Sequence, residues 1–152
     1  MNGVKLSVAA AFILQASIAF AGEVAPAEVK FEDLAVAASL TGVPGNAEEG
    51  AKVFKDRGLG NCLACHANKA METELFHGTV GPAMDGAGSR WEPEQLRAIV
   101  TDSKKVFGDE TVMPGFYSLD VGEQVREDLV GKTILTAQQV EDVVAYLSTL
   151  KE

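Results

Sequence analysis

The segment from Gly60 to Ala70 reads GNCLACHANKA and contains both cysteines of the 152-residue chain. Cys62 and Cys65 are separated by two residues, and His66 follows directly. This spacing is typical of a c-type haem site, in which two thiols add to the porphyrin vinyl groups and the adjacent histidine coordinates the iron. One tight turn can present all three groups to one porphyrin edge. The motif therefore predicts one haem c attached through Cys62 and Cys65, with His66 as an axial ligand.

Three other uses of this motif fit the remaining sequence less well. A thioredoxin-like redox pair would lie near a βαβ pattern, which the sequence does not contain. A structural zinc site needs four ligands, and the chain offers only His77 as a further histidine and no third cysteine. A disulfide between Cys62 and Cys65 suits an exported protein but leaves His66 without a role.

The first 21 residues have the pattern of a secretory signal peptide. Lys5 precedes an apolar run that extends to Phe20, and Ala19-Phe20-Ala21 is a small-x-small cleavage site. The run is shorter than the roughly 20 residues needed to span a bilayer. We therefore expect cleavage of residues 1–21, no membrane insertion afterwards, and a mature chain that begins at Gly22 in the periplasm.

The composition gives 22 acidic and 13 basic residues, for a formal net charge of −9. Nucleic acid is therefore not an expected partner, because phosphate binding depends on lysine and arginine. An acidic surface instead favours basic partner surfaces.

Helical periodicity and capping residues predict three helices. Asn46 is a good N-cap with Glu49 placed to complete a capping box, and Thr136 with Gln139 has the same pattern. The predicted helices run from about 47 to 57, from 93 to about 103, and from 137 to the C-terminus. No segment alternates with a period of two residues, so few strands are expected.

The remaining segments are long and contain glycine. Residues 22–45 are interpreted as an N-terminal arm, docked or disordered, that could hold a short helix around 31–38, and residues 46–152 as the folded domain. The stretches 67–90 and 104–133 are longer than most loops of compact domains, unless they wrap a ligand. The sequence thus predicts an all-α fold of three to five helices, with long loops wrapping one covalent haem.

Methionine is a common second axial ligand in cytochromes c. Met1 belongs to the signal peptide, and Met71 is too close in sequence to His66 to reach the opposite haem face easily. Met84 and Met113 remain. Met113 is favoured because it lies far along the second long loop, before a stiffening proline. Met84 is more simply an apolar lining residue.

Four further residues have expected roles. Pro82 offers a carbonyl oxygen that could accept a hydrogen bond from the histidine ligand. Arg90 and Trp91 precede a predicted helix and could hold the haem propionates by charge and by the indole N–H. An ordinary loop proline, a surface arginine and a core tryptophan are the simpler interpretations. His77 is a weak candidate ligand, because a lone histidine in a glycine-rich loop is usually solvated.

These features together resemble the class I cytochromes c. The shared elements are an N-terminal helix, Cys-x-x-Cys-His, a Gly-Pro turn, a Met-Pro loop and a C-terminal helix. In that family the first and last helices cross, and a glycine on one lets an aromatic side chain on the other approach. Gly50 and Phe54, facing Tyr146 and Leu147, match this arrangement.

A narrower resemblance covers nearly all of the mature chain. The segments SLTGVPGNAEEGAKVF, GNCLACH, SRWEPEQLRAIV, TVMPGFY and GKTILTAQQVEDVVAYLSTL are similar to the SoxX family, the monohaem subunits of SoxAX cytochromes. The resemblance implies a heterodimer with a SoxA-like monohaem or dihaem cytochrome. Such a complex couples thiosulfate oxidatively to a cysteine of the SoxYZ carrier, as an L-cysteine S-thiosulfotransferase, and passes electrons to a downstream cytochrome.

The residues also limit what this chain can do itself. Thioether bonds at Cys62 and Cys65 would leave no free thiol for sulfur transfer, and ligation by His66 and Met113 would leave the iron no open position. We therefore expect electron transfer and no catalytic residue in this chain. A free monohaem electron carrier is the alternative, and a haem-based sensor would need a labile ligand. The arm and the segment 117–135 are expected to form the partner surface.

Overall fold

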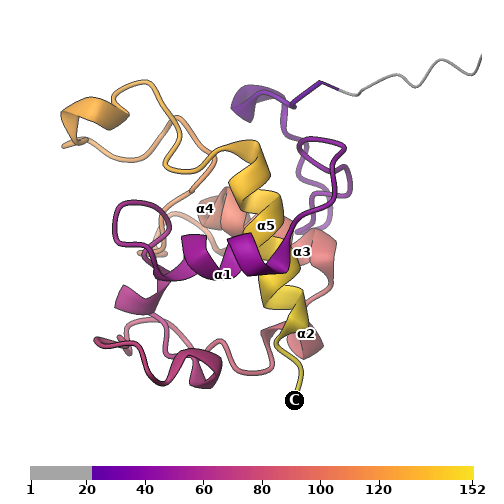
Figure 1. Ribbon diagram of the computed structural model, residues 1–152. Coiled ribbons are helices and arrows are strands. Elements are labelled where there is room, and N and C mark those ends of the chain that lie inside the picture. Colours follow the sequence, from indigo (N-terminus) through magenta and orange to yellow (C-terminus); the bar gives the residue numbers. More distant parts are fainter. Residues whose placement is uncertain (1–21) are drawn as a thin grey trace, which may run out of the picture.

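The computed structural model describes residues 22–152, and the predicted signal peptide lies outside the described residues. The described part is helical, with no strand and one isolated bridge between Glu32 and Ala35. The α-helices are α1 (Ala47–Lys55), α2 (Ala87–Arg90), α3 (Pro93–Thr101), α4 (Ser103–Phe107) and α5 (Ala137–Thr149) (Figure 1). Short 3₁₀ turns are η1 (Pro26–Glu28), η2 (Cys62–Ala64), η3 (Lys69–Met71) and η4 (Glu127–Leu129). The all-α prediction is confirmed.

Within residues 22–152, none of the helices combines the length and apolar character that crossing a bilayer requires.

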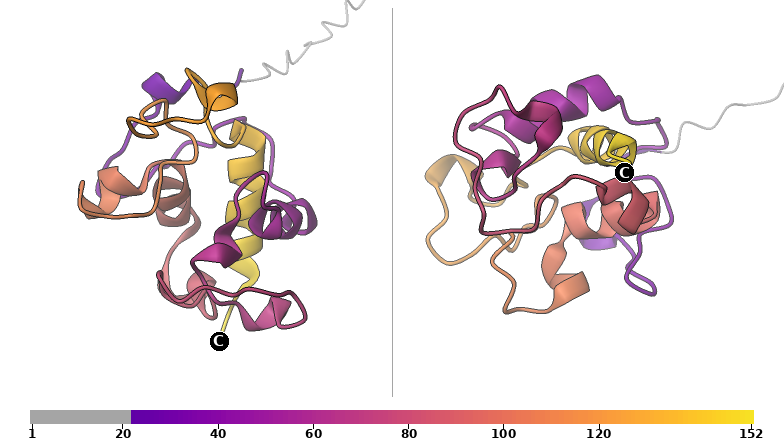
Figure 2. Two further views of the ribbon diagram at one scale, coloured as in Figure 1. Left: turned by 90° about the vertical axis from the view of Figure 1, so that its left-hand side faces the viewer. Right: turned by 90° about the horizontal axis from the view of Figure 1, so that it is seen from below.

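Helices α1 and α5 cross at the centre of the fold, and α5 lies between α1 and α3 (Figure 2). The crossing depends on Gly50, because a Cβ there would lie 1.9 Å from the Asp142 carbonyl oxygen and 2.9 Å from Cβ of Tyr146. Phe54 meets Tyr146 edge to face, with ring centroids 5.5 Å apart. The predicted helix crossing is therefore confirmed.

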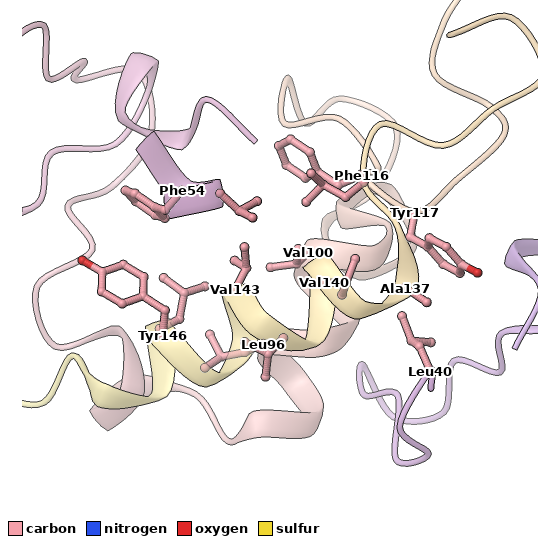
Figure 3. Packing of buried hydrophobic residues seen from close by; sticks show 14 of the residues in the cluster. Leu40, Phe54, Leu96, Val100, Phe116, Tyr117, Ala137, Val140, Val143 and Tyr146 are labelled. Carbon is pink, nitrogen blue, oxygen red and sulfur yellow. The ribbon is translucent and has the colours of Figure 1, made fainter. Parts of the chain in front are cut away.

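The buried core lies around this crossing and includes residues from α3 and from the segment before α5 (Figure 3). Phe54, Val140 and Val143 are each at most 1% exposed. Each such side chain removes enough apolar surface from water to contribute about 1.5–3 kcal/mol. The rest of the core labelled in Figure 3 is Leu40, Leu96, Val100, Phe116, Tyr117, Ala137 and Tyr146.

The predicted capping residues behave differently at the two helices. Thr136 and Gln139 form the full capping box of α5. The Asn46 side chain accepts hydrogen bonds from two backbone N–H groups of α1, but Glu49 does not complete the box. The Glu49 carboxylate pairs with Lys52 at 2.7 Å, and the Asn46 N–H donates to Asp142 Oδ1 at 2.8 Å. The Asn46 N–H is thus bonded to Asp142 of α5 in place of the Glu49 side chain.

The second predicted helix is divided in two. Helix α3 ends at Thr101, and α4 begins at Ser103. Asp102 between them has extended backbone angles, and its carboxylate accepts a hydrogen bond from the Lys104 N–H, which caps α4. The aspartate therefore turns the chain at this point.

The arm, residues 22–45, is docked on the helices, and the helix considered for 31–38 is absent. Asp33 and Leu34 have φ values of 48° and 64° and form a tight turn there. Val36 and Leu40 are 2% and 1% exposed. The Leu40 N–H donates to Oε1 of Glu141 at 2.7 Å. Docking of the arm is therefore observed, and the disordered alternative is wrong.

A buried ion pair fixes the same part of the arm. Arg97 Nε on α3 lies 2.9 Å from Oε1 of Glu141 on α5, and Arg97 Nη1 donates to the Val36 carbonyl at 2.8 Å. The two side chains are 11% and 5% exposed. Every charge in this cluster has a partner, as buried charges require.

Candidate haem site

The Cys-x-x-Cys-His motif forms a single tight turn. Asn61 has a left-handed backbone conformation with φ of 49°, after which the chain enters the 3₁₀ turn η2. The N–H groups of Cys65 and His66 both donate to the Cys62 carbonyl, at 3.1 and 2.9 Å. This local folding keeps the two thiols and the imidazole on one short piece of chain, as a haem attachment site needs.

The two thiols have different surroundings. Cys62 is half-buried and Cys65 is exposed. Burial raises the pKa of the Cys62 thiol to about 12. The thioredoxin-like alternative would need a βαβ unit, and residues 22–152 form no strand.

The imidazole of His66 is held by the turn at Gly81 and Pro82. Its Nδ1 lies 2.7 Å from the Pro82 carbonyl oxygen. A carbonyl oxygen can only accept, so Nδ1 carries the proton and the lone pair of Nε2 is available to a metal. The ring also packs on Gly81, where a Cβ would lie 2.3 Å from Cε1 of His66. The expected hydrogen bond to Pro82 is present, and its role in haem ligation stays a prediction.

Arg90 supports the segment that follows Pro82. Its Nη1 and Nη2 donate to the carbonyl oxygens of Asp85 and Ala83, at 2.5 and 2.9 Å. These contacts stabilise the segment next to the turn that holds His66. The sequence did not predict this role for Arg90. Trp91 is half-buried and meets Phe107 edge to face at 6.2 Å. Propionate binding by Arg90 and Trp91 stays a prediction.

The two candidate methionine ligands differ in what holds them. The Met84 N–H donates to the Ala67 carbonyl at 2.8 Å, beside His66. This bond ties Met84 to the histidine side of the site. Met113 belongs to the loop after α4, and its carbonyl accepts from Ser103 Oγ at 2.5 Å. Both side chains pack against the core. Iron ligation by Met113 stays a prediction.

His77 has a structural role in place of the expected solvated one. Its Nε2 donates to the Met71 carbonyl at 3.0 Å, and its Nδ1 accepts from the Asn68 N–H at 3.3 Å. Both ring nitrogens are thus used within the loop. Asn68 is buried and also donates to the Tyr146 hydroxyl at 2.8 Å. The loop is in this way tied to α5.

Residues 22–152 contain no separate metal site built from protein ligands alone. In the part of the chain that the structure describes, no three His, Cys, Asp or Glu side chains gather as metal ligands. The zinc alternative for the motif thus has no ligand set there. Two thiols, one oriented imidazole and a thioether instead suit iron held in a porphyrin.

Comparison with known proteins identifies the family. The family model for cytochrome c matches residues 47–151. The chain belongs to the cytochrome c family. This family carries covalent haem c, and Cys62 and Cys65 have the spacing of its attachment motif. A comparison with curated proteins gives no match.

Solved structures give a narrower similarity within the cytochrome c family. A chain in the crystal structure of SoxXA from P. pantotrophus is 48% identical, with a TM-score of 0.79. The match covers 86% of this chain and 100% of that one. Ferric cytochrome c-550 from Paracoccus versutus is 20% identical, with a TM-score of 0.39, over 71% of this chain and 99% of that one. The SoxXA similarity confirms the predicted resemblance to SoxX.

Two contributors to the cytochrome c site were missed from the sequence. The sequence predicts Gly81 only as part of a turn, whereas in the structure its missing side chain makes room for the His66 ring. It predicts Ser103 only as the end of a helix, whereas the Ser103 hydroxyl holds the Met113 backbone. The Gly-Pro dipeptide was a usable signal for Gly81. Nothing in the local sequence pointed to Ser103.

Proposed function

We propose that this chain is the electron-transfer subunit of a SoxAX-type cytochrome, in a periplasmic system that couples thiosulfate to a cysteine of a SoxYZ-like carrier. The 48% identity to a chain of SoxXA, over the full length of that chain, carries the proposal. The cysteine-thiosulfate transfer itself would take place on a SoxA-like partner. A downstream cytochrome would accept the electrons.

The residues of this chain would bind and orient the haem. Cys62 and Cys65 would tether it, and His66 and Met113 would coordinate its iron. Haem supplies one-electron transfer, and methionine ligation stabilises the ferrous state. The Pro82 carbonyl keeps the proton on Nδ1 of His66 and leaves Nε2 free. A fully ligated iron suits outer-sphere electron transfer and gives a substrate no position to bind.

An exposed apolar loop near the Cys-x-x-Cys-His motif supports the proposal of a permanent partner protein. Leu75, Phe76 and Val80 are 75%, 75% and 70% exposed. The Gly78 N–H donates to the Leu63 carbonyl at 2.8 Å, which places this loop beside the haem-attachment turn. Permanent interfaces are more apolar than those of transient redox partners. The free-carrier alternative would instead favour a small, charged contact surface.

The segment 117–135 remains part of the proposed partner surface. It extends away from the helices, in the upper left of Figure 1. Leu119 and Val130 are 54% and 65% exposed on it. The arm, residues 22–45, would contribute its outer face, since its inner face packs on α3 and α5. We also propose that residues 1–21 are removed as a signal peptide. The mature chain would then consist of this arm and a domain of residues 46–152.

Size-exclusion chromatography of periplasmic extract, followed by haem absorbance, tests the proposal. We expect this chain to co-elute with a larger c-type cytochrome. Replacing both Leu75 and Phe76 with serine should weaken that complex, whereas the exposed control Lys52→Ala on α1 should not. Elution of the unaltered chain alone, at monomer size, would contradict the subunit role and favour the free carrier.

A further inference from the structure

The loop that carries Met113 is held at several points by the end of α3 and by α4. Before the methionine, Lys104 Nζ donates to the carbonyl oxygens of Asp109 and Thr111, each at 3.0 Å. At the methionine itself, Ser103 Oγ donates to the Met113 carbonyl at 2.5 Å. These contacts come from two consecutive residues on the first turn of α4.

The chain after the methionine returns to α3. The N–H groups of Phe116 and Tyr117 donate to the carbonyl oxygens of Val100 and Thr101, at 3.2 and 3.0 Å. Phe116 and Tyr117 are themselves buried in the core. The loop is therefore anchored on both sides of Met113, and Ser103 supplies the contact at the methionine itself.

The Ser103 side chain is fully buried, with 0% of the residue exposed. A buried hydroxyl needs a partner, and this one uses the Met113 carbonyl. A serine near a helix start commonly caps its own helix, but at α4 that task falls to Asp102. The Ser103 hydroxyl is thus left free to hold a residue ten positions further along the chain.

We propose that Ser103 is a positioning residue for the Met113 ligand, with Lys104 as its assistant. A methionine side chain has three rotatable bonds, so the place of its sulfur depends on a fixed backbone. The Ser103 hydroxyl fixes that backbone and keeps the thioether on the iron when other ligands compete. The inference rests on the proposed ligation by His66 and Met113.

Imidazole binding to the ferric, haem-loaded protein tests the inference. Imidazole must displace the thioether to bind, so its affinity reports how firmly the methionine is held. We expect Ser103→Ala to bind imidazole about tenfold more tightly, the scale of one lost hydrogen bond. The long-wavelength absorption band of thioether-ligated ferric haem should disappear at correspondingly lower imidazole concentration. Lys104→Met should show a smaller change in the same direction.

Ser148→Ala is the matched control, because the Ser148 hydroxyl bonds only within α5, to the Val144 carbonyl at 2.7 Å. It should leave imidazole binding unchanged. Equal imidazole affinity in the unaltered protein, Ser103→Ala and Lys104→Met would overturn the inference. Should Ser103→Ala not fold, Lys104→Met decides alone, since Lys104 lies near the surface. Absence of the thioether band from the unaltered protein would instead refute the Met113 ligation itself.

Discussion

The carbonyl oxygen of Pro82 lies 2.7 Å from Nδ1 of His66, across sixteen residues of chain. This contact selects the tautomer whose Nε2 can bind iron. Arg90 stabilises the segment after Pro82 by donating hydrogen bonds to the carbonyl oxygens of Ala83 and Asp85. Contacts within the protein therefore set the imidazole orientation.

Gly81→Ala should disturb this orientation directly. The new Cβ would lie 2.3 Å from Cε1 of His66 and push the ring away from its position. Overpacking of this kind costs about 1–3 kcal/mol. We expect the haem-loaded variant to unfold at correspondingly lower denaturant concentration, with a shifted midpoint potential. Gly58→Ala is the control, because its new Cβ would meet only the end of the Asp56 side chain, at 3.2 Å. Equal stability of both variants would refute the close-packing argument.

Gly50→Ala should weaken the crossing of α1 and α5. Its Cβ would overlap the Asp142 carbonyl at 1.9 Å, and backbone cannot move aside as a side chain can. We expect a loss of about 3 kcal/mol or more in the free energy of unfolding, measured by chemical denaturation. Lys52→Ala, on the exposed face of the same helix, serves as the control and should change stability little. A Gly50→Ala protein of unaltered stability would mean that the helices do not cross this closely.

Arg97→Met should loosen the arm. The change leaves the buried Glu141 carboxylate without its ion-pair partner, a defect that costs about 3–5 kcal/mol. We expect limited proteolysis to cut within residues 22–45 faster than in the unaltered protein. Arg126→Met removes the exposed pair with Asp128 and should leave the cleavage rate as it is. Slow cleavage in both variants would show that the ion pair does not hold the arm.

Tyr117 should make stability depend on alkaline pH. Burial, reinforced by the Glu23 carboxylate 3.0 Å away, raises the pKa of Tyr117 from 10.0 to about 12. Because the folded state keeps this proton longer, the stabilisation is fully present below pH 10. It is lost as the pH rises towards about 12. Tyr117→Phe should therefore show a flatter decline of the free energy of unfolding over this range. Parallel declines in the two proteins would contradict the assignment.

Much of the fold followed from local sequence signals. Thr136 and Gln139 formed the predicted capping box because both partners lie within one helical turn. The motif from Cys62 to His66 formed the predicted tight turn for the same reason. In both cases the interacting residues are only a few positions apart, so a local sequence pattern was enough to predict the contact.

Two contacts that the sequence did not predict join residues far apart in the chain. The Asn46 N–H bonds to Asp142, ninety-six residues away, so the predicted contact with Glu49 was not made. Docking of the arm depends on Arg97 and Glu141, which are forty-four residues apart in sequence. Such pairs are set by the tertiary packing of α3 against α5, and no local pattern in a single sequence identifies them.

Reduction of the haem by thiosulfate tests the central claim most directly. The haem-loaded chain would be mixed with its SoxA-like partner, the carrier and thiosulfate, and the oxidation state of its haem followed by absorbance. The account predicts reduction of this haem only when partner and carrier are both present. A haem that stays ferric in the complete mixture, yet is reduced readily by dithionite, would contradict an electron-transfer role in thiosulfate oxidation.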